Sequence, residues 1–154
     1  MSTSLHPDLP LIQNADLDGK VVLVRFDHNV VKKGEIRDPY RIDRTIGTLF
    51  HIVERGGRPI LMTHVGRPKD KKTGTITCRQ DESVEPIVRY LEQKLHTKLY
   101  IPQFPADAER GIVGIDTSIN HAIRVLRERK IVGSYLTNTR WFHREEANVE
   151  VRER

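Results

Sequence analysis

Short apolar runs alternate with amphipathic stretches along this chain. The first run, Lys-Val-Val-Leu-Val-Arg at residues 20–25, is rich in valine and follows Asp18-Gly19, a pattern typical of a buried strand. Similar runs predict three further strands, at residues 59–63, 99–101 and 131–136. Gly133 weakens the last of these, because glycine has no side chain to pack in a sheet.

Between these runs, apolar residues recur at helical spacing and predict three helices. The first begins at Arg41 and stops at Gly56-Gly57, and its apolar face comprises Ile42, Ile46, Leu49, Phe50 and Val53. The second follows Ser83, a candidate cap, and its apolar face comprises Val84, Ile87, Val88, Leu91 and Leu95. The third follows candidate caps at residues 116–118, and its apolar face comprises Ile119, Ala122, Ile123 and Leu126.

The order strand–helix, repeated three times and closed by a strand, predicts an α/β domain. We expect a Rossmann-like three-layer arrangement with a mostly parallel sheet and right-handed crossovers. Residues 26–40 and 64–82 are polar and are expected to be loops. Since ligands bind beyond the carboxyl ends of strands in such sheets, these two loops and the segment after Leu136 are where function is expected.

Composition narrows the class of protein. The chain has 154 residues, enough for one domain, and a formal net charge of +5, which favours phosphorylated metabolites, nucleic acid or acidic membrane without choosing among them. A single cysteine, Cys78, excludes an internal disulfide. No signal sequence and no membrane-spanning apolar run is recognisable, so we expect a cytoplasmic location.

The three loops carry side chains suited to anions: Asp27, His28 and Asn29, then His64, Gly66 and Arg67, then Asn138 and Arg140, with Arg41 at the start of the first helix. The planar guanidinium fork binds carboxylate and phosphate bidentately, and a glycine lets the backbone approach a ligand closely. An Asp or Asn among these cations orients a hydroxyl. The set suits a small molecule that bears both a negative group and a hydroxyl.

Taken singly, each of these residues also has a structural interpretation. A lone arginine on a loop is usually solvated, His64 could bond a backbone carbonyl, and Asp27 and Asn29 could be turn residues. The loop lysines Lys69, Lys71 and Lys72 are expected to be solvated. No nucleophile–base pair, metal-ligand spacing or phosphate-binding glycine loop is recognisable, so hydrolase chemistry is disfavoured. The functional interpretation depends on three loops meeting at one edge.

Four blocks of sequence occur in an order and at a spacing that match one known family. They are Val-Leu-Val-Arg-Phe-Asp-His-Asn-Val at 22–30, Asp-Pro-Tyr-Arg-Ile at 38–42, Leu-Met-Thr-His-Val-Gly-Arg-Pro-Lys at 61–69, and Asn-Thr-Arg-Trp at 138–141 with the acidic pair Glu145-Glu146. Across about residues 18–148 the chain resembles the phosphoglycerate kinases.

The resemblance implies a function in glycolysis and gluconeogenesis, with transfer of a phosphoryl group between 1,3-bisphosphoglycerate and ADP. It implies that 3-phosphoglycerate or 1,3-bisphosphoglycerate is bound by Asp27, His28, Asn29, Arg41, His64, Val65, Gly66, Arg67 and Arg140. Arg41 would also neutralise charge on the phosphoryl group in flight, the one catalytic role expected here. Mg-ATP or Mg-ADP would be held by a second α/β domain, and the family is usually monomeric.

The chain also departs from the family pattern. His28 stands where a Phe is usual and Val31 where a Pro is usual, while Thr137 and Thr139 replace a Glu and a Leu beside Arg140. The length accommodates only part of the N-terminal, 3-phosphoglycerate-binding domain within residues 1–154, so the sheet is expected to be incomplete at its C-terminal end and the nucleotide-binding domain to be absent.

From this we expect a truncated kinase that does not turn over alone, with an exposed sheet edge and a tendency to self-associate. The alternative is a non-catalytic anion-binding or interaction module derived from such a kinase. Nucleic-acid binding is disfavoured, because aromatic residues make up only 6% of the chain and no recognition motif is present. We therefore expect neither nucleic acid nor membrane as a partner.

Overall fold

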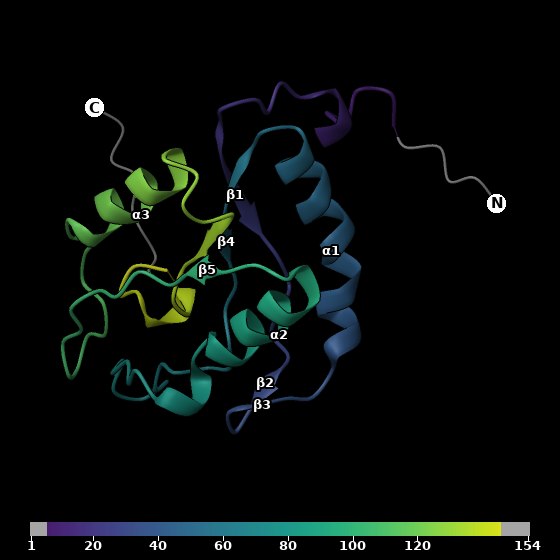
Figure 1. Ribbon diagram of the computed structural model, residues 1–154. Coiled ribbons are helices and arrows are strands. Elements are labelled where there is room, and N and C mark those ends of the chain that lie inside the picture. Colours follow the sequence, from purple (N-terminus) through teal and green to yellow (C-terminus); the bar gives the residue numbers. More distant parts are fainter. Residues whose placement is uncertain (1–5, 146–154) are drawn as a thin grey trace.

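The computed structural model describes residues 6–145 and contains a four-stranded sheet flanked by helices (Figure 1). The strands are β1 (Val21–Arg25), β4 (Arg58–Met62), β5 (Leu99–Tyr100) and β6 (Gly133–Tyr135), in the spatial order β1-β4-β6-β5. Each neighbouring pair is parallel. The helices are α1 (Pro39–Glu54), α2 (Glu85–Leu95) and α3 (Ser118–Arg127). The predicted α/β fold with a parallel sheet is therefore confirmed.

Element boundaries differ modestly from the predictions. Helix α1 begins at Pro39, two residues before the predicted start at Arg41, because proline is tolerated where the backbone N–H has no helical partner. The Ser83 hydroxyl accepts a hydrogen bond from the N–H of Glu85 at 3.2 Å, although the N-cap position of α2 is Val84 and not Ser83. Strand β6 is only three residues long.

The main core lies between the sheet and helices α1 and α2. Leu61 of β4 and Tyr135 of β6 are fully buried there, together with Ile42 of α1 and Leu91 of α2. Helix α3 lies on the opposite side of the sheet from α1 (Figure 1). The core consequently fixes the carboxyl ends of β1, β4 and β6 relative to the start of α1.

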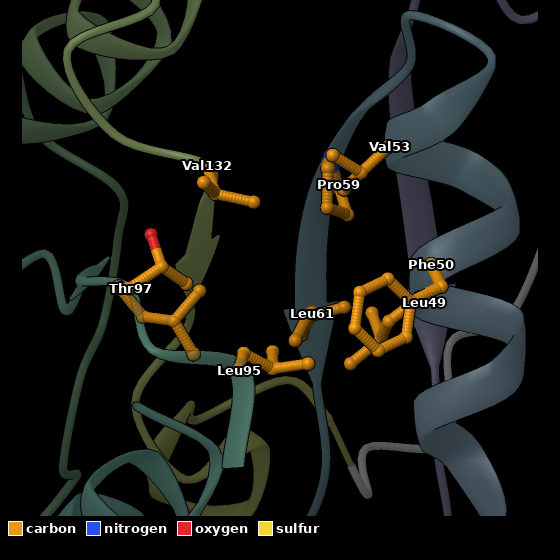
Figure 2. A pocket seen from close by; sticks show the side chains of 9 residues that line it. Leu49, Phe50, Val53, Pro59, Leu61, Leu95, Thr97 and Val132 are labelled. Carbon is orange, nitrogen blue, oxygen red and sulfur yellow. The ribbon is translucent and has the colours of Figure 1, made fainter. Parts of the chain in front are cut away.

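One residue of the predicted apolar face of α1 is exposed, and two others, Ile46 and Val53, are partly buried. Phe50 is 50% exposed, whereas Ile52, which was not assigned to that face, is fully buried. Phe50 instead borders an apolar pocket of about 130 Å³ between α1 and the sheet, with Leu95 at the end of α2 across from it (Figure 2). Among the side chains that line this pocket, only Thr97 carries a polar group.

The expected loop at residues 26–40 contains a small hairpin, β2 (Val31–Lys32) and β3 (Glu35–Ile36), which the sequence analysis missed. Its two-residue turn, Lys33-Gly34, has positive φ at both positions (53° and 75°), the geometry that matches the twist of a tight hairpin. Val31 is buried and anchors the hairpin to the core.

Strand β1 forms one edge of the sheet and, among the described residues, pairs only with β4. Leu23 is in register with Ile60 and therefore shares its face of the sheet. Ile60 is buried, but Leu23 is 67% exposed. This uncovered edge agrees with the expected incomplete sheet. No helix within residues 6–145 is long and apolar enough to span a bilayer.

Candidate functional site

Three loops meet at the carboxyl edge of the sheet, and Gly66 is the point where they touch. The N–H of Gly66 donates to Asn29 Oδ1 at 3.0 Å, and its carbonyl accepts a hydrogen bond from Arg140 Nη1 at 2.7 Å. The loops after β1, β4 and β6 are thus joined through one residue. Gly66 has φ +61°, and a Cβ at this position would lie 2.7 Å from the Glu82 carboxylate, so the position requires glycine.

Asn138 holds the loop after β4 and the loop after β6 together. Its buried side chain accepts hydrogen bonds from the N–H of Val65 at 3.0 Å and of Arg140 at 3.1 Å. Its amide nitrogen donates to the carbonyls of Val65 at 2.8 Å and Glu82 at 3.0 Å. All four hydrogen-bonding positions of the amide are therefore used by the protein. The side chain of Val65, expected to be part of the binding set, is fully buried, so only its backbone lies near the carboxyl edge of the sheet.

Arg41 lies at the start of α1 and faces two carboxylates. Its guanidinium is 3.4 Å from Asp27 and 3.5 Å from Asp38, and half of its side-chain surface is exposed. Asn29 is exposed, and because its Oδ1 is engaged by Gly66, its Nδ2 is the group that remains to donate to a ligand. Arg67 is exposed, with no side-chain hydrogen bond or ion pair to another described residue.

His64 is half-buried at the same edge, and its pKa is lowered by burial and then by the nearby cations Arg140 and Arg25. The lowered pKa favours the uncharged imidazole at neutral pH. Arg25 pairs with Glu145 at 2.9 Å. Glu146, the second acid of the predicted pair, lies outside the described residues.

His28, expected among the binding residues, has its ring in the core and not at the rim. The side chain is fully buried, with Nδ1 2.8 Å from the Tyr135 hydroxyl and Nε2 2.9 Å from the Thr45 hydroxyl. Thr45 donates its proton to the Ile42 carbonyl, so it accepts from Nε2–H, and Nδ1 accepts from Tyr135. This leaves a neutral imidazole with both nitrogens satisfied.

The consequence of that arrangement is a pKa for His28 of about 4, lowered chiefly by burial and partly opposed by Asp27. The ring links the loop that carries Asp27 and Asn29 to α1, one turn after Arg41, and to β6. Neither Thr45 nor Tyr135 was predicted to belong to the site. Their positions in predicted elements gave no sign of a polar role.

The apolar pocket of Figure 2 shares no lining residue with this site, and its walls carry no charged group. Among residues 6–145, no three His, Cys, Asp or Glu side chains converge as a metal site would require. The candidate site of the described part is therefore the rim built on Asn29, Arg41, His64, Gly66 and Arg140, with the exposed Arg67 and Asp27 beside it.

Comparison with known proteins gives one consistent match. Residues 12–153 match the family model for phosphoglycerate kinase. Phosphoglycerate kinase of Wolbachia sp. subsp. Brugia malayi is 30% identical over 92% of this chain, and that of Clostridium tetani is 33% identical over 90%. A solved phosphoglycerate kinase from Pyrococcus horikoshii superposes with a TM-score of 0.64 at 20% identity, over 90% of this chain and 30% of the solved one. The chain spans 31% of the length of each of the two curated relatives.

Proposed function

The chain belongs to the phosphoglycerate kinase family, and from that premise we propose that residues 1–154 form part of an N-terminal domain that binds 3-phosphoglycerate or 1,3-bisphosphoglycerate. The whole protein would transfer a phosphoryl group between 1,3-bisphosphoglycerate and ADP in glycolysis, in the cytoplasm. The observation that carries the proposal is the joining of three anion-binding loops at Gly66 by Asn29 and Arg140.

The family resemblance implies a role for each side chain of the rim and for Arg67 and Asp27 beside it, and the chemistry of each side chain suits that role. Arg67 and Arg140 supply guanidinium forks for the phosphate, with the neutral His64 as a further hydrogen-bonding group. Asn29, through its Nδ2, and Asp27 hold the hydroxyl side of the acid. Arg41, half-exposed beside Asp27, neutralises charge on the carboxylate and on the phosphoryl group in flight.

The nucleotide substrate, Mg-ATP or Mg-ADP, is assigned to another part of the protein. Among the described residues no acidic cluster is available for the magnesium ion, and we assign no residue of this chain to it. Catalysis in this class of reaction depends on holding donor and acceptor together and on stabilising charge. A polypeptide of residues 1–154 would therefore bind the acid substrate but would not turn it over.

Calorimetric titration of 3-phosphoglycerate into the 154-residue chain tests the binding site. We expect a dissociation constant in the micromolar to millimolar range. Arg67→Ala and Arg41→Ala should abolish measurable binding. Arg89→Ala is the matched control, because Arg89 is an exposed cation on α2 whose ion pair with Glu85 lies outside the rim. Equal heats for all three variants and the wild type would refute the site.

A coupled enzyme assay tests the proposal that residues 1–154 alone do not turn over the substrate. The pure 154-residue chain should give no ATP-dependent phosphorylation of 3-phosphoglycerate, even at substrate concentrations that saturate binding. Turnover above the background of the Arg41→Ala variant would show that the chain binds nucleotide after all. Binding without turnover supports the proposal, and the absence of both would favour a degenerate fragment.

A further inference from the structure

The unpredicted β2–β3 hairpin forms one wall of the candidate site. A pocket of about 410 Å³ opens between this hairpin and the start of α1. Its lining includes Asn29, Arg41 and Gly66 of the rim together with two cations, Lys32 of β2 and Arg37 directly after β3. One acid, Asp38, also lines the pocket, and it is already paired with Arg41 at 3.5 Å. His64, Arg67 and Arg140 do not line this pocket. The hairpin cations therefore face a different part of a bound ligand from the cations of the loops after β4 and β6.

The main chain that carries these two cations is held in place on both sides. The N–H of Arg37 donates to the carbonyl of Val30 at 2.8 Å, and Val30 is buried. At the tip of the hairpin, the N–H of Gly34 donates to the carbonyl of Asp81 at 3.0 Å. A ligand would thus meet a backbone that is already ordered, and only the side chains of Lys32 and Arg37 would lose freedom on binding.

Neither cation is committed to a strong interaction within the protein. Lys32 has no ion pair with another described residue. Among residues 6–145, Arg37 pairs only with Glu35, at 3.2 Å, and both side chains are more than half exposed. Such exposed pairs contribute little to stability, so Arg37 can exchange this carboxylate for a phosphate, which offers more charge and more acceptor oxygens.

We propose that Lys32 and Arg37 form a cationic wall that makes the site favour the doubly phosphorylated acid over the singly phosphorylated one. This rests on the proposed function. The group that reacts is a carboxylate in one substrate and an acyl phosphate in the other, and the second carries more negative charge. Cations beside Arg41 therefore stabilise the acyl phosphate more than the carboxylate, whereas the cations near Arg140 bind the unchanged phosphate of both.

The test compares two ligands on the same variants by calorimetry. The probes are 3-phosphoglycerate and a non-hydrolysable bisphosphonate analogue of 1,3-bisphosphoglycerate, in which methylene groups replace the bridging oxygens. Lys32→Ala/Arg37→Ala should weaken binding of the bisphosphonate about ten-fold and of 3-phosphoglycerate about three-fold or less. Arg89→Ala, which removes an exposed cation elsewhere, should change neither affinity.

The ratio of the affinity for the bisphosphonate to the affinity for 3-phosphoglycerate decides whether the hairpin proposal holds. An unchanged ratio in the double variant overturns the hairpin proposal but leaves the proposed function intact, provided that Arg67→Ala still loses 3-phosphoglycerate. A wild-type chain that binds neither probe overturns both. Lys32→Gln/Arg37→Gln, which retains more of each side chain, must reproduce the change in ratio, and circular dichroism of both variants must match the wild type.

Discussion

His28 makes the stability of this protein depend on pH in a way that one substitution should remove. The ring is buried, neutral and hydrogen-bonded at both nitrogens, to Tyr135 and Thr45. Protonation would place a second N–H against the Tyr135 hydroxyl, which already donates to it, inside a core where charge is costly. His28→Phe keeps a ring of similar shape and removes the titrating group.

The magnitude follows from the pKa. Burial lowers the pKa of His28 from 6.5 to about 4. The unfolded chain binds a proton below pH 6.5, whereas the folded chain binds one only below about pH 4, so acid favours the unfolded state between these values. The contribution is fully present above pH 6.5 and is lost as the pH falls towards 4. Its full size is about 3 kcal/mol, of which about 2 kcal/mol is lost by pH 5.

Urea unfolding at pH 7 and pH 5 measures this loss of stability, with the fluorescence of Trp141, the single tryptophan, as the probe. At pH 7, His28→Phe should be less stable by about 1–3 kcal/mol, because the buried Tyr135 hydroxyl loses its partner. At pH 5 that deficit should shrink by about 2 kcal/mol. His64 also has a lowered pKa, but it is present in both proteins and its effect cancels.

The control is His28→Phe/Tyr135→Phe, which removes the stranded hydroxyl. It should recover part of the stability at pH 7 and should show the same weak pH dependence as the single variant. If the free energies of wild type and His28→Phe fall in parallel between pH 7 and pH 5, the ring is not held neutral and the reasoning is refuted.

Three further changes probe other parts of the structure. Asn138→Ala should lower the free energy of unfolding by about 3 kcal/mol in urea titrations, since four backbone groups lose a buried partner; a loss below about 1 kcal/mol would contradict this. Gly111→Ala should cost about 2 kcal/mol or more, because φ is +68° and a Cβ would meet the carbonyl of Trp141, whereas Gly114→Ala, with open space around it, should be nearly neutral. Leu23→Lys should weaken self-association in analytical ultracentrifugation without changing stability by more than about 0.5 kcal/mol, and equal association constants would exclude the β1 edge as the contact.

Hydrophobic periodicity predicted the three helices because each has enough residues to show a period, and continuous apolar runs predicted the four strands of the sheet, the two-residue β5 among them. The β2–β3 hairpin gives neither signal, because each of its strands joins one apolar residue to one charged residue. Two-residue strands such as Val31–Lys32 and Glu35–Ile36 are too short to display alternation, and the turn residues Lys33-Gly34 are not among the strongest hairpin signals.

The candidate site was predicted as a set of loops, but the placement of individual side chains was not. His28 lies between Asp27 and Asn29 in sequence and shares their polar character, which suggested a position at the rim. Its burial depends on Thr45 and Tyr135, which are 17 and 107 residues away along the chain. A sequence pattern relates residues that are close along the chain. It therefore could not identify Thr45 and Tyr135, which only the packing of α1 and β6 brings to His28.

If the proposed function is right, the exposure of Arg41 decides how its contribution divides between binding and catalysis. Asn29 and Arg140 both bond to Gly66, so the protein's own hydrogen bonds hold the rim together and acid binding is expected to require little reorganisation. Arg41, by contrast, keeps half of its side-chain surface in contact with solvent. At 4 Å a unit charge interacts with another by about 1 kcal/mol in water but about 4 kcal/mol near a partly shielded protein surface. An open Arg41 can therefore help to bind a substrate that its neighbours also hold, but it stabilises the charge of a transferring phosphoryl group weakly until something covers the rim and excludes water. By the same reasoning, the affinity of the 154-residue chain for 3-phosphoglycerate should fall steeply as salt is added.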